Sequence, residues 1–375
     1  GGAACRAGMG GAPRRVGVLG LGNWGTSLGH LWAQAGHTVR GWTVERGVFE
    51  SMRLDGENRK YLAGTRTTIE VTMDLAELAE GCDVLVLVVP SSVLMQVVGD
   101  LMPHLQPRHI LLDLAKGLAA TSAGGRLDES PPPHPPPGAP APARPAPPRP
   151  AASRSVMETL SFCIERQLEA AGKRNPVAVL TGPTIAPEVA RGVITTALVA
   201  CKEAGVAEDL TRDLSTPSFL LRPAADPRGA ELWGAFKNPI ALACGMVDGL
   251  HPEGGDNLKA ALVMAGFREG MQILEAMGAR HETAFGPAGL GDLYVTSTSQ
   301  SSRNRTLGQK LGSGLPLADA LGEMHMVAEG VRATRMFRSE AQALGVEHPF
   351  LEAMAGVLDG EVGPEEAARR MVNAC

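Results

Sequence analysis

A glycine-rich turn between a short apolar stretch and a helix-length segment constrains the fold of this chain most. The run Gly20-Leu21-Gly22-Asn23-Trp24-Gly25 follows the apolar residues 16–19 and precedes a helical pattern that continues to about residue 35. In such a turn Gly20 makes the tight bend, Gly22 lets phosphates approach the backbone, and Gly25 lets the helix pack on the sheet. Because 46 of the 375 residues are glycine, the motif has weight only through its place between strand and helix. It predicts a dinucleotide-binding site, the alternative being a purely structural turn.

Alternating strand and helix patterns extend this prediction over the first part of the chain. We expect strands at 37–42, 83–89, 110–114, 177–181, 195–200 and 218–221, and a helix at 157–171. Such alternation predicts right-handed βαβ units in a parallel sheet. Beyond Gly229 the segments are rich in Ala, Leu, Met and Glu, which favours helices.

The length of 375 residues exceeds what one hydrophobic core usually fills, so two domains are expected. We place a Rossmann-type dinucleotide-binding domain at 14–227 and an all-helical substrate-binding and catalytic domain at 228–375, with a boundary near Pro227. Residues 1–13 are rich in Gly and Ala, lack the apolar centre of a secretory signal, and are expected to form a disordered extension. The predicted fold class is therefore α/β followed by all-helical.

Composition argues against several classes of function. The formal net charge of -5 disfavours nucleic-acid binding, which needs excess Lys and Arg. The six cysteines form no CxxC pair, so we expect neither a disulfide framework nor a metal site, and a reducing, cytoplasmic compartment fits best. The longest apolar run, residues 84–89, is too short to span a bilayer, so no membrane anchor is expected.

A proline-rich insertion interrupts the predicted Rossmann domain at 128–152. Residues 131–150 hold 12 of the chain's 28 prolines, which remove backbone donors and fix φ. This stretch is expected to be an exposed, partly polyproline-II excursion. It is either a tolerated insertion without function, as loop length costs little free energy, or a tract that binds an SH3- or WW-like domain.

The residues after the second strand usually select the cofactor. An acidic residue accepts hydrogen bonds from the ribose 2′-hydroxyl of NAD, whereas a basic residue accommodates the 2′-phosphate of NADP. Here Glu45 and Arg46 are adjacent and of opposite charge, so the choice between NAD and NADP stays open.

A lysine in an apolar setting stands out in the second half of the chain. Lys237 follows Leu232, Trp233 and Phe236 and precedes an Ala/Leu-rich helix. Burial of this kind lowers the pKa of an amine and makes it a usable acid or base near neutral pH. A surface lysine on a helix is the alternative.

Seven motifs in order resemble the NAD(P)-dependent glycerol-3-phosphate dehydrogenase family of bacterial type, over roughly residues 15–365. They are Gly20-Leu21-Gly22-Asn23-Trp24-Gly25-Thr26, Val89-Pro90-Ser91, Ala115-Lys116-Gly117, Gly182-Pro183-Thr184, Gly234-Ala235-Phe236-Lys237-Asn238, Gly289-Leu290-Gly291-Asp292-Leu293 and Ser302-Arg303-Asn304-Arg305. The resemblance implies reversible hydride transfer between a nicotinamide cofactor and dihydroxyacetone phosphate or sn-glycerol 3-phosphate, which supplies phospholipid synthesis. It also implies a Rossmann domain followed by a helical domain.

The same resemblance assigns roles to individual residues. Lys237 is the proton acceptor, Lys116 lies beside both cofactor and substrate, and Asp292 binds substrate and is placed to orient Lys237. Further substrate contacts fall on Gly182, Thr184, Ser302, Arg303 and Asn304. Further cofactor contacts fall on Asn23, Trp24, Ala186, Arg303, Val327 and Glu329; for Trp24 and Val327 ordinary core packing is an equal alternative.

The triplet at 302–304 offers a hydroxyl, a guanidinium fork and an amide, which suits a phosphate, and Arg305 adds a second positive charge. A solvated polar turn is the alternative. The chain departs from the family pattern at Ala115, at Met264-Ala265 and in a longer segment at 251–255, which bears on substrate affinity more than on reaction type.

Two other functions are compatible with the sequence. One is a related hydroxyacid dehydrogenase, which the triplet at 302–304 argues against; the other is a catalytically silent dinucleotide-binding sensor or scaffold. A homodimer is expected as well, because helical second domains in such enzymes often pair.

Overall fold

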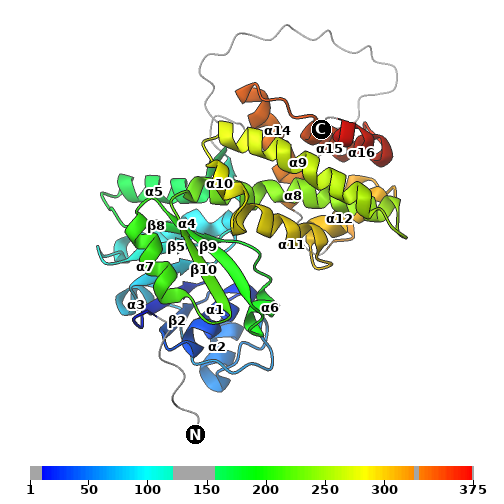
Figure 1. Ribbon diagram of the computed structural model, residues 1–375. Helices are drawn as coiled ribbons and strands as arrows, with labels where there is room; N and C mark the ends of the chain where they lie inside the picture. The colour runs from blue at the N-terminus through cyan, green and yellow to red at the C-terminus, as the bar shows by residue number, and fades with distance from the viewer. Residues whose placement is uncertain (1–10, 121–156, 325–328, 374–375) are drawn as a thin grey trace.

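The computed structural model describes residues 11–120, 157–324 and 329–373. The proline-rich insertion 128–152, residues 1–10 of the expected extension, and Val327 lie outside this described part. The described chain forms a sheet flanked by helices, followed by a cluster of helices (Figure 1). This confirms the predicted fold class.

Eight strands form the main sheet in the order β10-β9-β8-β5-β4-β1-β2-β3. Their bounds are β1 Arg15–Leu19, β2 Thr38–Trp42, β3 Glu70–Thr72, β4 Val84–Leu87, β5 Ile110–Asp113, β8 Val177–Thr181, β9 Thr195–Cys201 and β10 Phe219–Ala224. From β3 to β8 all pairs are parallel, in the 3-2-1-4-5-6 order of a dinucleotide-binding fold. The ligand-binding crevice of such a sheet lies at the carboxyl ends of its strands.

Helices cover both faces of this sheet and bury its apolar side chains in separate clusters. They are α1 Asn23–Gln34, α2 Arg46–Asp55, α3 Leu75–Gly81, α4 Ser91–Leu101 with the 3-10 turn η1 Met102–His104, α5 Leu160–Ala170, α6 Ala186–Ala190 and α7 Ala204–Leu214.

The expectation of a fully parallel sheet is wrong at β9, which pairs antiparallel with β8. The connection between them contains only α6, which has five residues. A helix of that length advances about 7 Å, less than half the length of β8, so the chain reverses instead of crossing back over the sheet. β10 then pairs parallel with β9.

The helix expected at 157–171 is wrong in its first three residues. Met157–Thr159 is strand β7, which pairs antiparallel with β6 (Leu118–Ala120), and the helix begins only at Leu160. This ladder directly follows Lys116 and Gly117 in the chain. The partner strand comes from the far side of the insertion, so no local pattern could reveal the pairing.

From Pro227 onward the described residues form helices packed around one apolar core. They are α8 Pro227–Leu250, α9 Asp256–Ala276, α10 His281–Ala284, the π-type turn η3 Pro287–Gly291, α11 Asp292–Thr298, α12 Arg303–Gly312, α13 Leu317–Gly322, α14 Glu329–Leu344, α15 Pro349–Leu358 and α16 Pro364–Asn373. α8 lies at the centre of this group and is buried over most of its length (Figure 1). No helix within the described ranges is long and apolar enough to cross a membrane.

Candidate active site

A cavity of about 370 Å³ lies where the sheet part meets the helical part. Ten of the predicted site residues line it: Asn23, Lys116, Thr184, Ala186, Lys237, Asp292, Ser302, Arg303, Asn304 and Glu329. The sequence motifs that carry them are spread over more than three hundred positions, and the fold brings them to one place. The cavity also has lining residues that the sequence did not single out as site residues: Ile185, Pro187, Asn238, Val295, Thr296, Ser299 and Ser301.

The glycine turn has the geometry that a dinucleotide requires. Gly20 has φ +107°, in the left-handed region, and a Cβ there would lie 2.8 Å from the carbonyl oxygen of Val88. A Cβ on Gly25 would lie 2.0 Å from the carbonyl oxygen of Gly20, whereas one on Gly22 would point into open space. No side-chain hydrogen bond caps the start of α1, which leaves its first N–H groups available to a ligand. These features fit a bound pyrophosphate.

A buried asparagine, which the sequence did not single out, makes hydrogen bonds that hold this turn in place. The Nδ2 of Asn58 donates to the carbonyl oxygen of Leu21 at 2.9 Å and to Oγ1 of Thr26 at 2.8 Å. Its own Oδ1 accepts from the backbone N–H of Tyr61 at 3.2 Å. Because Asn58 lies in an irregular segment after α2, no periodic pattern marked it.

Two lysines and one aspartate form the charged centre of the cavity. Lys237, on the buried α8, and Lys116, after β5, both contact Oδ2 of Asp292 at the start of α11. The Lys116 Nζ to Asp292 Oδ2 distance is 3.4 Å, and the contact from Lys237 is a short hydrogen bond. Thr296, one turn further along α11, donates to the backbone oxygen of Asp292 at 2.7 Å and fixes that turn.

Burial and neighbouring charges move the pKa values of these three groups apart. Burial lowers the pKa of Lys237 to about 8, against the attraction of Asp292 and with help from the positive charge of Lys116. Lys116 also loses hydration, which alone would lower its pKa, but the Asp292 carboxylate, the hydrogen bonds of the cluster and Glu329 together raise it. Burial would raise the pKa of Asp292, yet the two ammonium groups hold it below its ordinary value. The lowered pKa of Lys237 confirms the prediction from its apolar neighbours.

The polar triplet at the start of α12 divides into exposed and interior groups. Ser302 is the N-cap of α12, its Oγ accepting from the backbone N–H of Arg305 at 3.3 Å. Asn304 is buried and makes interior hydrogen bonds, since its Nδ2 donates to Oδ1 of Asn238 and its Oδ1 accepts from the N–H of Gly330. Glu329 completes this group, accepting from Nδ2 of Asn238 at 3.5 Å.

Arg305, expected to add positive charge to the triplet, is turned away from the cavity. Its Nε donates to Oδ2 of Asp248 on α8 at 2.5 Å. Its Nη1 donates to the backbone oxygen of Thr298, also at 2.5 Å. Arg303, in contrast, lines the cavity. Of the two guanidinium groups, therefore, only that of Arg303 lines the cavity.

Several predicted site residues do not line the cavity. Trp24 packs edge-on against Phe219 of β10, with ring centroids 6.3 Å apart. Gly182 has φ +151°, and a Cβ there would lie 3.0 Å from Cα of Ala197, which gives this glycine a structural role. Glu45 and Arg46 lie at the start of α2, with contacts described below.

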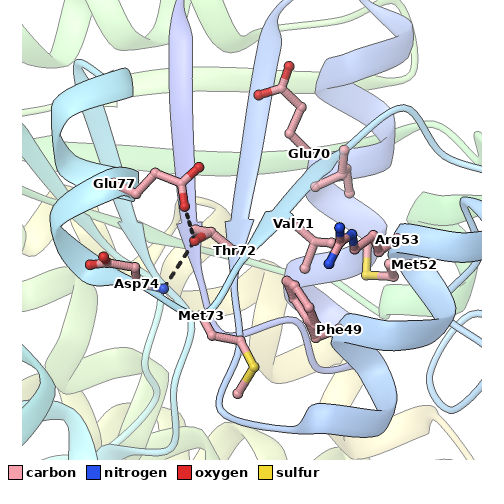
Figure 2. Close-up of a pocket in the computed structure, with 10 residues that line it drawn as sticks. Phe49, Met52, Arg53, Glu70, Val71, Thr72, Met73, Asp74 and Glu77 are labelled. Atoms are coloured by element: carbon pink, nitrogen blue, oxygen red, sulfur yellow. Dashed lines mark hydrogen bonds between the residues drawn. The ribbon is translucent and has the colours of Figure 1, made fainter.

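A second cavity, of about 610 Å³, lies at the edge of the sheet between α2, β3 and α3. Figure 2 shows Phe49, Arg53, Val71 and Glu77 around it, and no predicted site residue among the side chains drawn. Across the described ranges, no group of three or more His, Cys, Asp or Glu residues is placed to hold a metal ion.

Family models match both parts of the chain. The model of the NAD-dependent glycerol-3-phosphate dehydrogenase N-terminus matches residues 15–129 and 153–207, and the model of the C-terminus matches residues 226–369. A protein of Syntrophotalea carbinolica named glycerol-3-phosphate dehydrogenase [NAD(P)+] is 37% identical over 354 residues, which cover 94% of this chain and 95% of the relative. One of Geobacter sulfurreducens with the same name is 36% identical, covering 96% of each chain.

Solved structures agree with this assignment. The glycerol-3-phosphate dehydrogenase of Coxiella burnetii superposes with a TM-score of 0.75 at 28% identity, covering 95% of this chain and 98% of that one. The yeast glycerol-3-phosphate dehydrogenase, at 22% identity and a TM-score of 0.78, shares the fold. By matched models, sequence and structure, the chain belongs to the NAD-dependent glycerol-3-phosphate dehydrogenase family.

Proposed function

We propose that this protein interconverts dihydroxyacetone phosphate and sn-glycerol 3-phosphate with NAD(H) or NADP(H), supplying glycerol 3-phosphate for phospholipid synthesis. The observation that carries the proposal is the Lys116–Asp292–Lys237 cluster inside a cavity that also reaches the glycine turn and Arg303. A cation pair, one buried carboxylate and a guanidinium suit a small phosphorylated ketone better than an uncharged hydroxy compound.

The chemistry divides between the cofactor and the side chains. A nicotinamide dinucleotide whose pyrophosphate lay at the glycine turn would supply or accept the hydride at the carbonyl carbon. In the reducing direction the ammonium of Lys237 donates a proton to the oxygen that becomes the alcohol; in the oxidising direction its free amine accepts that proton. Lys116 stabilises the negative charge that develops on the same oxygen.

Asp292 keeps both lysines in place and prevents their mutual repulsion from separating them. The phosphate of the substrate then meets Arg303 and the hydroxyl of Ser302 at the start of α12. Lys237 is only 4% exposed, so its ammonium group has little contact with bulk water.

The test is an activity assay with dihydroxyacetone phosphate and each reduced cofactor, followed by the loss of near-ultraviolet absorbance. Lys237→Ala should lower kcat by several orders of magnitude, since it removes the proton donor, and should leave cofactor binding intact. Lys202→Ala is the matched control, because Lys202 is an exposed lysine paired with Glu165 far from the cavity, and it should keep full activity. Near-normal turnover of the Lys237 variant, or cofactor binding without turnover in the wild type, would contradict the proposal.

Further proposals concern organisation. We propose a domain boundary at Pro227, where α8 begins, a cytoplasmic location and a homodimer. Large apolar side chains exposed on the helical part, among them Met264 and Tyr294, supply a surface that a second copy would cover. Light scattering on the purified protein tests the dimer: a single-chain mass would contradict it.

A further inference from the structure

The carboxylate that follows β2 is held in one orientation. Glu45 is the N-cap residue of α2, and its Oε1 accepts from the hydroxyl of Tyr61 at 2.7 Å. Its Oε2 accepts from Nζ of Lys60 at 2.5 Å. The Lys60 ammonium and the Tyr61 hydroxyl lower the pKa of Glu45, so the group is a fixed anion at neutral pH. Its side chain remains 39% exposed, which leaves it accessible to a ligand.

The position of this carboxylate is tied to the glycine turn. The backbone N–H of Gly20 donates to the carbonyl oxygen of Trp42, the last residue of β2, at 3.0 Å. Residues 58–61 form a second connection between the turn and Glu45, because Asn58 donates to the carbonyl oxygen of Leu21 and the Tyr61 hydroxyl donates to Glu45. One short segment, residues 58–61, therefore contacts both the glycine turn and the carboxylate of Glu45.

The adjacent cation is directed elsewhere. Nε of Arg46 donates to Oε1 of Glu50 one helical turn along α2, at 2.9 Å, and its side chain is 84% exposed. Lys60 is already paired with Glu45, so neither cation presents a free charge beside the carboxylate. In a doubly wound fold, this place at the end of the second strand meets the 2′ position of the adenosine ribose.

We propose that Glu45 makes this protein select NAD(H) over NADP(H), with Tyr61 and Lys60 as positioning residues for its carboxylate. The inference rests on the dinucleotide site of the proposed function and decides the choice that the sequence left open. Each carboxylate oxygen has a lone pair left for a ribose hydroxyl. A 2′-phosphate would instead bring a second anion against Glu45, and relief would require breaking the Lys60 and Tyr61 hydrogen bonds.

Equilibrium binding to the full-length protein, without substrate, tests this selection directly. NADH and NADPH are each titrated into wild type and followed by calorimetry and by cofactor fluorescence. Wild type should bind NADH at least about tenfold more tightly, the size expected for one charged hydrogen bond gained or one repulsion avoided. Glu45→Gln should reduce this ratio to about one or below, mainly through tighter NADPH binding, because Lys60 is then released for the phosphate.

Two further variants separate charge from orientation. Tyr61→Phe keeps the charge of Glu45 but removes one positioning bond, so it should weaken NADH binding and leave NADPH binding nearly unchanged. Glu208→Gln is the control, since it removes a carboxylate at an exposed position of α7 and releases neither Arg46 nor Lys60, and it should leave the ratio as in wild type. Thermal unfolding of each variant establishes that it is folded.

The outcomes distinguish this inference from the function on which it rests. Equal binding of the two cofactors, tighter NADPH binding by wild type, or an unchanged ratio in Glu45→Gln overturns the selection by Glu45. Failure of both cofactors to bind wild type overturns the dinucleotide site itself, and with it the proposed function.

Discussion

Lys116 and Lys237 contact the same carboxylate oxygen, yet their pKa values move in opposite directions. Loss of hydration lowers the pKa of both groups, although the Lys237 side chain is 5% exposed and that of Lys116 is 35% exposed. For Lys237 this loss and the charge of Lys116 outweigh the attraction of Asp292, whereas for Lys116 the attraction of Asp292 and the hydrogen bonds of the cluster together outweigh it. The pair therefore keeps one permanent cation beside one group that exchanges a proton near neutral pH.

This division predicts a pH profile with a defined sign. Reduction needs protonated Lys237, so kcat/KM should fall as pH rises through about 8; oxidation needs its free amine, so kcat/KM should rise through the same value. Lys116→Met removes a neighbouring positive charge and should move the transition to higher pH. Asp292→Asn removes the stabilising negative charge and should move it to lower pH.

Both profiles come from initial rates between pH 6 and pH 10, roughly the range in which a lysine of lowered pKa titrates. Lys202→Met serves as a control for removal of a distant positive charge. Shifts in the same direction for the Lys116 and Asp292 variants would show that the transition does not belong to Lys237.

Individual site residues were predictable only where local sequence carries the chemistry. The apolar neighbours of Lys237 predicted its lowered pKa, which the structure bears out. The interior hydrogen bonds of Asn304 were not predictable, because its partners Asn238 and Gly330 lie on other helices and meet it only through helix packing. Asn58 gave no signal, as its two acceptors lie more than thirty positions earlier in the chain.

At the scale of elements, the crossing of α8 and α12 fixes the phosphate end of the site. Glycines make this crossing close: a Cβ on Gly308 of α12 would lie 2.0 Å from the carbonyl oxygen of Leu242 on α8. A Cβ on Gly245 of α8 would lie 2.0 Å from the carbonyl oxygen of Arg305 on α12. Backbone lies on both sides, so no flexible side chain can move aside.

Gly308→Ala should therefore push α12 away from α8 and cost about 1–3 kcal/mol of unfolding free energy, as overpacking does. Because Ser302 and Arg303 begin α12, the KM for dihydroxyacetone phosphate should rise while cofactor affinity stays unchanged. Gly205→Ala is the matched control: Gly205 is a helical glycine in α7 with open space around it, and alanine should stabilise that helix slightly. Urea unfolding and substrate kinetics check both variants, and a Gly308 variant as stable and active as the control would contradict the tight crossing.

Helices and strands were predicted correctly where a local pattern specifies them, and incorrectly where pairing with a distant strand determines the structure. Most strands of the sheet were placed within one or two residues of their observed bounds. β3 was missed because it has only three residues, and β7 because its partner β6 lies across the insertion. The reversal at β9 depends on the length of α6, which hydrophobic periodicity does not measure.

At the scale of the whole molecule, the site exists only where the two parts meet. Asn23, Lys116 and Thr184 come from the sheet part, whereas Lys237 and Asp292 come from the helical part. Composition and periodicity predicted the sheet part and the helical part, but no pattern within either part determines how the two pack against each other. The resemblance to the family brought these residues together before the structure did.

Stability of the whole molecule should depend on a buried carboxyl far from the cavity. Glu269 of α9 accepts from the backbone N–H groups of Phe350 and Leu351, at 2.6 and 3.0 Å, at the start of α15. Burial nevertheless raises its pKa to about 7. Between its unfolded pKa of about 4.5 and this value the folded protein binds more protons than the unfolded one, so stability falls as pH rises through this window.

The expected loss between pH 5 and pH 8 is on the order of 3 kcal/mol from this group. Glu231, whose pKa burial also raises, adds to the loss, while His30, His37 and His109, whose pKa values burial lowers, oppose it. The informative quantity is therefore the change in unfolding free energy between pH 5 and pH 8, measured by urea unfolding for wild type and for each variant. That difference should shrink or reverse in Glu269→Gln and stay as in wild type in Glu208→Gln, a control at an exposed position of α7. If Glu269→Gln instead loses the same stability at both pH values, the carboxyl is already ionised when folded, and its hydrogen bonds to α15 outweigh its burial.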